Sequence, residues 1–131
     1  CSCYAGLVPS RALALEQLKL LPEDQRVEVL RQRPEDQWFE RTSSRIDPRD
    51  LADLMIGVAN ADGGLLCVGI HDGRVEGIAA AGPKRLNEWR QAAIDFTEPP
   101  IRHRFEIIPC ANDRDAADEL VLIEIDASER V

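Results

Sequence analysis

One group of residues that could bind a ligand consists of arginines and serines gathered around a helix start. They are Arg41, Ser43, Ser44, Arg45 and Arg49, on either side of Asp47-Pro48. The dipole and free N–H groups of a helix N-terminus attract anions, and arginine holds phosphate through paired hydrogen bonds. The pattern therefore predicts a phosphate site. The alternative is a polar loop whose arginines pair with nearby acids such as Asp47 or Asp50.

A second candidate phosphate site is the turn Asn60-Ala61-Asp62-Gly63-Gly64. Because a glycine pair lets backbone N–H groups approach a phosphate closely, Asn60, Gly63 and Gly64 are candidate binding residues. The structural interpretation is a glycine C-cap after a helix, with Asn60 hydrogen-bonding the helix end to the turn. The two interpretations are compatible, because a turn glycine can serve both.

A third candidate is the pair Arg102 and Arg104, which alternates with His103 in a strand-like segment. Alternation places both arginines on one face, where they could contact a nucleic-acid backbone. A solvated strand edge is the alternative. Aromatic residues form only 5% of the chain, which argues against a base-stacking platform. We therefore expect three aromatic side chains in the core, namely Trp38, Trp89 and Phe96.

The charge balance restricts nucleic-acid binding to a local site. The chain has 24 acidic and 16 basic residues, which gives a net charge of −8. Non-specific binding requires lysines and arginines that neutralise many phosphates, so a uniformly adhesive DNA-binding surface is not expected. Only Lys19 and Lys84 among the basic residues are lysines. The remainder are arginines, which are the better bidentate partners for phosphate.

The rest of the composition indicates a globular chain. Its 131 residues suit one packed domain, and no apolar run approaches the ~18 residues of a membrane span. Four cysteines without a C-x-x-C motif indicate reduced thiols and a cytoplasmic location. Because the chain begins at Cys1 rather than methionine, we expect a fragment of a longer protein, with an effector domain outside it.

Cap and turn signals predict the order β-α-β-β-α-β-β after a short helical segment. Asp47 and Pro48 mark a helix start, and the Asp72-Gly73 pair marks a hairpin turn. The expected elements are two helices in 9–33, a strand at 38–39, a helix in 47–59, strands at 65–71 and 74–78, a helix from 83, and strands at 101–109 and 119–126. This order predicts an α/β (α+β) fold, a mixed sheet with packed helices.

Spaced motifs in residues 35–126 give a more specific prediction. Glu35 is followed five residues later by Glu40, then by the helix end Val58-Ala59-Asn60-Ala61-Asp62-Gly63-Gly64, and then by Asp72-Gly73 and Gly77-Ile78 after an apolar strand. This pattern resembles the Schlafen AlbA-like domain family, often described as DNA-binding. The resemblance implies a Schlafen AlbA-like domain at 35–131, preceded by a helical N-terminal segment at 1–34 that the local helix signals predict.

The resemblance implies a nucleic-acid-binding module for DNA or structured RNA. Such a module would belong to a bacterial-type transcriptional regulator, would be non-catalytic by itself, would need no cofactor, and would be able to form a homodimer. A third interpretation, a protein-interaction or dimerisation module, is kept open by the net charge of −8.

Schlafen-type relatives imply an enzyme as the alternative, a metal-dependent endoribonuclease directed at tRNA or rRNA. Its two glutamates and one aspartate match Glu35, Glu40 and Asp72, which would hold Mg²⁺ or Mn²⁺. The lysine that follows the second glutamate in the family is Thr42 here, which argues against catalysis. Turn chemistry alone also explains Asp72, and an exposed acidic surface explains both glutamates.

Overall fold

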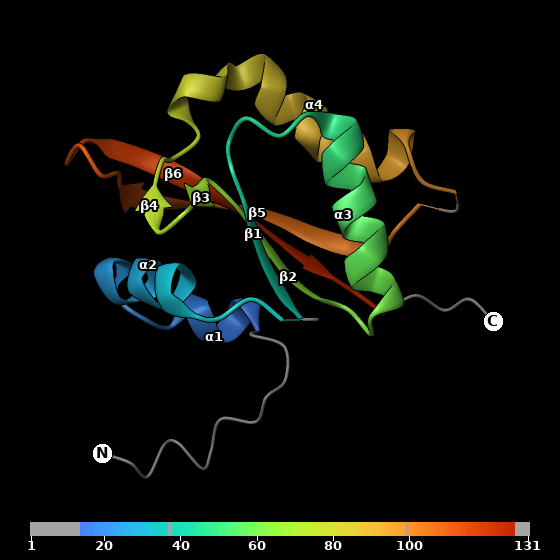
Figure 1. The fold of residues 1–131 in the computed structure, drawn as a ribbon, viewed down its shortest axis with the longest axis horizontal. Helices are drawn as coiled ribbons and strands as arrows, with labels where there is room; N and C mark the ends of the chain where they lie inside the picture. Colours follow the sequence, from blue (N-terminus) through green and yellow to red (C-terminus); the bar gives the residue numbers. More distant parts are fainter. Residues whose placement is uncertain (1–13, 37, 99, 128–131) are drawn as a thin grey trace, which may run out of the picture.

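The structure is a computed structural model that describes residues 14–36, 38–98 and 100–127. Figure 1 shows the arrangement of its helices and strands. In chain order the elements are α1 (Leu15–Lys19), α2 (Glu23–Gln32), β1 (Phe39–Thr42), α3 (Pro48–Asn60), β2 (Gly64–Val68), β3 (Ile70–His71), β4 (Arg74–Val75), the 3₁₀ helix η2 (Ala79–Ala81), α4 (Gly82–Asp95), β5 (His103–Ala111) and β6 (Ala117–Ile125).

The main sheet is mixed and has the strand order β1-β2-β6-β5. Strands β1 and β2 are parallel, whereas β6 runs antiparallel to both β2 and β5. Strands β3 and β4 form a separate two-stranded hairpin. The predicted α+β class with a mixed sheet and packed helices is therefore confirmed.

Helices cover both faces of the sheet. Strand β6 shows this directly, because Val121 and Ile123 pack with α3 and α4 while Leu120 and Leu122 pack with α1 and α2. Figure 1 shows α1 and α2 on one side of the strands and α3 and α4 on the other. A strand buried on both faces needs apolar residues at consecutive positions, which explains the unbroken apolar runs at 65–68 and 120–123.

The two N-terminal helices belong to this packing. The predicted pair of short helices is confirmed within the described residues, as α1 and α2. Leu15, Leu18 and Leu30 are at most 1% exposed and share a core cluster with side chains of the sheet. The division into an N-terminal segment at 1–34 and a domain at 35–131 stays a prediction.

Helix α3 begins and ends as its sequence predicts. The Asp47 side chain accepts a hydrogen bond from the amide of Asp50 (3.0 Å), and Pro48 occupies the first turn. Such a cap satisfies an N–H group that the helix leaves unpaired. On α4, Trp89 is 1% exposed and its indole Nε1 donates to the carbonyl of Ile46 (2.9 Å). This bond fixes the loop that leads into α3.

Two of the predicted strands were longer than the strands in the structure. The predicted strand 65–71 breaks at Gly69, whose φ is +119°, because the chain leaves the main sheet there. The Gly69 amide donates to the Thr42 carbonyl (2.9 Å), and its carbonyl accepts from the amide of Glu76 (2.7 Å). The predicted return strand 74–78 ends at Val75, because residues after it turn towards η2.

The expectation that Trp38, Trp89 and Phe96 all lie in the core was only partly correct. Trp89 is buried, Trp38 is half-buried, and Phe96 is 37% exposed. The Arg49 guanidinium lies 4.6 Å from the centre of the Phe96 ring, so this ring has a cation rather than apolar side chains over one face.

The half-buried carboxylate of Asp118, on β6, holds the segment after β4 in place. Its Oδ1 accepts from the amides of Ile78 and Ala79 (2.9 Å each), and its Oδ2 accepts from Nδ2 of Asn112 (3.0 Å). Burial raises the pKa of Asp118, but the hydrogen bonds from Asn112 and the backbone amides outweigh it and leave the pKa below the ordinary value of 3.8. These bonds favour the charged form.

We predict that Asp118→Ala lowers the midpoint of urea unfolding at pH 7 and that its effect shrinks in acid. A carboxyl with a lowered folded-state pKa stabilises the fold above its ordinary pKa and loses that contribution as the pH falls through the folded-state value. The difference in unfolding midpoint between Asp118→Ala and the unsubstituted domain should therefore narrow below pH 3.8. Asp53→Ala, on the exposed face of α3, is the control. A gap that stays constant from pH 7 to pH 3 would contradict this account.

Candidate functional site

The most distinctive surface feature is a cavity of about 700 Å³ with arginines in its lining. Four of its lining residues are arginines, namely Arg45, Arg74, Arg85 and Arg114. We call this cavity, with these four side chains, the arginine pocket. Its size falls within the range of small-ligand sites, about 300–1,000 Å³. The concentration of arginine is unusual, because the chain as a whole carries a net charge of −8.

Four segments that are distant in sequence supply the four arginines. Arg45 lies in the loop between β1 and α3, Arg74 in β4, Arg85 early in α4, and Arg114 in the β5–β6 loop. Figure 1 shows the β3–β4 hairpin, the start of α4 and the β5–β6 turn towards the same end of the sheet. The pocket therefore exists only when the whole domain is folded.

The loop that carries Arg114 is held by Asn112, which is 9% exposed. The Asn112 Oδ1 atom accepts from the amides of Arg114 (2.9 Å) and Ala116 (3.1 Å). Asp113 joins this loop to β4, because its Oδ2 accepts from the amide of Val75 (2.9 Å). The segments bearing Arg74 and Arg114 are thus fastened to each other.

The loop that carries Arg45 is fastened to β4 by Glu76. The carboxylate of Glu76 accepts from the hydroxyl of Ser43 (2.9 Å) and from the amide (3.0 Å) and hydroxyl (3.2 Å) of Ser44. Burial raises the pKa of Glu76, but these bonds from Ser44 and Ser43 outweigh it, so its pKa is lowered. The sequence predicted that Ser43 and Ser44 bind an anion, and in the structure that anion is the protein's own carboxylate.

Most of the pocket arginines keep hydrogen-bond donors that an anion could use. Within residues 14–36, 38–98 and 100–127, no carboxylate forms an ion pair with Arg45, Arg74 or Arg114, and Arg85 pairs with Glu88 at 3.6 Å. An arginine with no acidic partner keeps its hydrogen-bond donors available to an anion. The pocket therefore presents a local positive charge.

Arg41, predicted to bind phosphate, has a different environment. It projects from β1 towards α2, where its Nη1 donates to the carbonyls of Leu30 (3.0 Å) and Arg33. Its guanidinium also lies 5.2 Å from the centre of the Phe39 ring. A cation at the carbonyl end of a helix is stabilising, so these contacts give Arg41 a structural role and we leave it out of the candidate site.

The glycine pair packs against backbone, while the C-cap residue of α3 is Ala61. Gly63, with φ +83°, donates its amide to the carbonyl of Val58 (2.8 Å), and a Cβ there would lie 2.7 Å from the carbonyl oxygen of Ile125. A Cβ on Gly64 would collide with the backbone of Trp38. Asn60 is exposed and lines a second cavity that contains Arg102. None of the three lines the arginine pocket.

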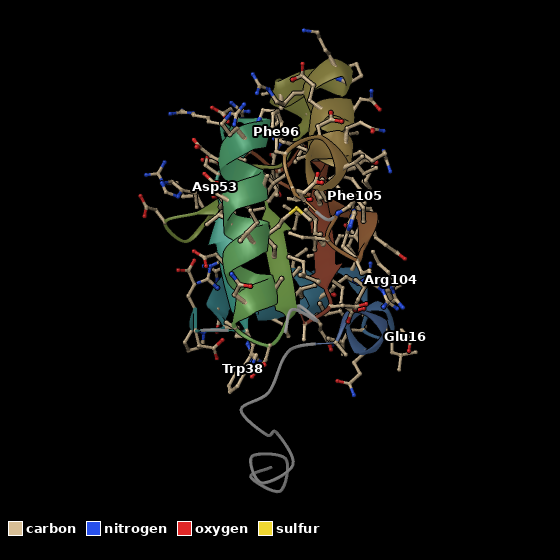
Figure 2. All side chains as sticks on the ribbon, turned by 90° about the vertical axis from the view of Figure 1, so that its right-hand side faces the viewer. Glu16, Trp38, Asp53, Phe96, Arg104 and Phe105 are labelled. Carbon is tan, nitrogen blue, oxygen red and sulfur yellow. The ribbon has the colours of Figure 1, made fainter. Side chains whose placement is uncertain are left out.

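Three further arginines predicted to bind nucleic acid lie apart from the pocket lining. Arg49 lies over Phe96, and Arg102 pairs with Asp126 at 3.9 Å. Arg104 pairs with Glu124 at 3.3 Å and approaches Glu16 at 4.0 Å. Figure 2 shows Arg104 beside Glu16. Of the five arginines predicted to bind phosphate or nucleic acid, only Arg45 is among the residues that line the arginine pocket.

Of the three predicted metal-binding carboxylates, two lie near each other. Burial and the charge of Glu35 raise the pKa of Glu40, whereas Asp72 is exposed and lies 3.5 Å from the His71 imidazole. In the part of the chain that the structure describes, no group of three or more His, Cys, Asp or Glu side chains could hold a metal ion. These positions do not fit an Mg²⁺ or Mn²⁺ centre, and the catalytic assignment of Glu35, Glu40 and Asp72 stays a prediction.

The two described cysteines are unsuited to nucleophilic chemistry. Cys67 and Cys110 are both buried free thiols. Burial raises the pKa of each to about 12. Because the thiolate is the reactive form, neither side chain is a nucleophile at neutral pH.

Comparison with known families agrees with the motifs read from the sequence. The family described as Schlafen, AlbA_2 has a sequence model that matches residues 35–131. The chain belongs to this family. All four arginines of the pocket lie within the matched part of this Schlafen AlbA_2 domain. No curated protein sequence matches the chain. Among the described residues, no helix has the length and apolarity needed to cross a membrane.

The sequence analysis missed Arg74, Arg85 and Arg114. A usable signal was present for two of them, since Arg74 follows the turn pair Asp72-Gly73 and Arg114 follows Asn112-Asp113. An arginine at the tip of each of two hairpins is a repeated feature. Only the folded arrangement shows that the two tips meet, and Arg85 follows no turn pair of this kind.

We predict that Asn112→Ala weakens ligand binding at the arginine pocket without removing any arginine. The substitution deletes the acceptor that holds the amides of Arg114 and Ala116, and a buried hydrogen bond of this kind contributes about 1 kcal/mol. We expect a loss of affinity of roughly fivefold, measured by fluorescence anisotropy with a labelled oligonucleotide. Asn87→Ala, on the exposed face of α4, is the control. Unchanged affinity in Asn112→Ala would show that loop position does not matter.

Proposed function

We propose that this Schlafen AlbA_2 domain binds nucleic acid through the phosphates, at the arginine pocket, and acts as a non-catalytic module of a cytoplasmic transcriptional regulator. The observation that carries the proposal is the convergence of Arg45, Arg74, Arg85 and Arg114 on one cavity in a chain with net charge −8. A protein this acidic needs a local positive site to approach a polyanion.

The start of α4 supports the same proposal. Ala80 and Ala81, immediately before this helix, line the pocket. The first turn of α4 contains no acidic residue, and no side chain caps it. The positive end of the helix dipole is therefore not neutralised locally, and it adds to the attraction that the arginines exert on an anion.

The lining also indicates which part of a nucleic acid is contacted. Among the described residues it contains no aromatic side chain, so these residues give bases no surface on which to stack. Arginine can contact either a phosphate or a base edge, but a concave site favours the protruding phosphate. The proposal therefore predicts weak dependence on base sequence. Homodimerisation through another surface remains part of the proposal, because a regulator that binds DNA commonly does so as a symmetric dimer.

Binding of labelled oligonucleotides and tRNA, followed by fluorescence anisotropy over a range of salt, tests the proposal. The affinity should fall with salt with a logarithmic slope no steeper than about −4, because at most four arginines contribute. Arg45→Ala should weaken binding about tenfold through the loss of one charge-assisted contact. Arg49→Ala is the matched control, because Arg49 lies over Phe96 and outside the pocket lining.

The same samples distinguish the enzyme alternative. Tight binding without strand cleavage, with or without Mn²⁺, agrees with the proposal. Cleavage that requires Mn²⁺ and disappears in Glu40→Gln would overturn the non-catalytic assignment. Absence of binding to every nucleic acid would overturn the proposal as a whole, and a protein-interaction role would then be favoured.

A further inference from the structure

The charges of the arginine pocket point to a doubly charged ligand. Four arginines are among its lining residues, together with two acidic residues, Glu76 and Asp113. Counted over the lining residues alone, this leaves two positive charges in excess, and Glu88, outside the lining, pairs with Arg85 at 3.6 Å. A phosphodiester inside a nucleic-acid strand carries one negative charge, whereas a phosphate monoester carries about −1.5 to −2 at pH 7 and has three strong acceptor oxygens.

The two carboxylates do not cancel the arginines by direct pairing. Glu76 is occupied by Ser43 and Ser44, and Oδ2 of Asp113 accepts from the amide of Val75. Both acids hold backbone segments in position, and neither forms an ion pair with Arg45, Arg74 or Arg114 within the described ranges. The segments bearing Arg45, Arg74 and Arg114 are thus held by the acids, and these three arginines keep donors for a ligand.

The directions from which the arginines come also favour the end of a strand over its middle. They arise from a loop, a strand, a helix and a second loop, each a separate segment of the fold. Donors that approach one cavity from several segments can surround a protruding terminal phosphate with its three free oxygens. An internal phosphodiester has only two free oxygens and continues into the chain on both sides.

We propose that the arginine pocket recognises the terminal phosphate monoester of a nucleic-acid strand. This inference rests on the proposed function, since it specifies which phosphate of the nucleic acid enters the site. Arginine stays charged at every pH used in such work, whereas the second pKa of a phosphate monoester is about 6. Preference for a terminal phosphate should therefore weaken in mild acid.

The test compares three ligands of one sequence context by fluorescence anisotropy or competition. They are a single-stranded oligonucleotide with a 5′-phosphate, the same strand with a 5′-hydroxyl, and the matching nucleoside 5′-monophosphate. We expect the phosphorylated strand to bind at least tenfold more tightly than the hydroxyl strand at pH 7.5 and only a few fold more tightly at pH 5.5. The preference should disappear in Arg74→Ala/Arg114→Ala, and circular dichroism should show that this variant is folded.

Each outcome separates the inference from the function on which it rests. Equal affinity for both strands, lost in Arg74→Ala/Arg114→Ala, would overturn terminal recognition and leave nucleic-acid binding at the pocket intact. Binding of neither strand would overturn both. If the monophosphate binds as tightly as the phosphorylated strand, the rest of the strand contributes nothing and the ligand is a mononucleotide. A preference that persists in the double variant would place the phosphate elsewhere.

Discussion

The double substitution Arg74→Glu/Arg114→Glu is expected to reduce the affinity of the domain for a phosphorylated oligonucleotide at least about 100-fold. Each arginine supplies charge-assisted hydrogen bonds, which contribute about 1.5–3 kcal/mol each. The new carboxylates would also repel the phosphate at short range. Both arginines lie in hairpin segments and have no ion pair to lose among the residues described, so the fold should tolerate the change.

The control for this experiment is Arg102→Glu/Arg104→Glu, which alters the net charge by the same amount. Those arginines lie on or beside β5, outside the lining of the arginine pocket. A general electrostatic effect would weaken binding equally in the two variants. A local site predicts a large loss in the pocket variant and a change of about threefold or less in the control, because exposed charges at a distance are screened by salt. Equal losses would contradict a local site.

Leu30→Ala is expected to destabilise the whole domain by about 2–5 kcal/mol, the usual range for a buried leucine. Leu30 is 0% exposed in α2 and packs in the cluster that includes Leu65, Leu120 and Leu122 of the central strands. Its truncation removes apolar contacts and leaves a cavity between the helices and the sheet. Urea unfolding followed by tryptophan fluorescence in a Trp38→Phe background measures the loss, because the remaining tryptophan, Trp89, lies on the opposite face of the sheet.

A leucine in the same helical region provides the matched control. Leu20 is 84% exposed, so Leu20→Ala should change the free energy of unfolding by about 0.5 kcal/mol or less. If the N-terminal helices were only an appendage, Leu30→Ala would leave the unfolding transition reported by Trp89 unchanged. That result would contradict the shared core.

Local signals in the sequence were sufficient for most of the fold. Asp47 and Pro48 predicted the start of α3 because capping depends on neighbouring residues alone, and the Asp72-Gly73 turn predicted the β3–β4 hairpin for the same reason. The break at Gly69 was missed, because an apolar run gives no sign of the residue at which a chain leaves one sheet for another. Phe96 was wrongly predicted to lie in the core, because the sequence does not show whether an aromatic side chain near a helix end is buried.

The candidate site was harder to predict, because it depends on contacts between distant segments. Of the arginines predicted in the loop at 41–49, Arg45 lines the pocket. Strand alternation directs Arg41 to the α2 side of the sheet. The carboxylate of Glu76, 32 residues away along the chain, accepts a hydrogen bond from the hydroxyl of Ser44. Neither pairing has a signal in the local sequence. Arg114 enters the site only because β5 and β6 form a hairpin whose tip is joined to β4.

The measurement that most directly tests the central claim is an NMR titration of the ¹⁵N-labelled domain with a 5′-phosphorylated oligonucleotide. Both the backbone amides and the arginine Nε–H groups would be followed. The arginine pocket predicts that the largest shifts occur at Arg45, Arg74, Arg85 and Arg114, with smaller shifts at Ser44 and Asn112 beside them. If the largest shifts instead occur at the Gly63-Gly64 turn and at Arg102 and Arg104, while the four pocket arginines do not change, the account is wrong.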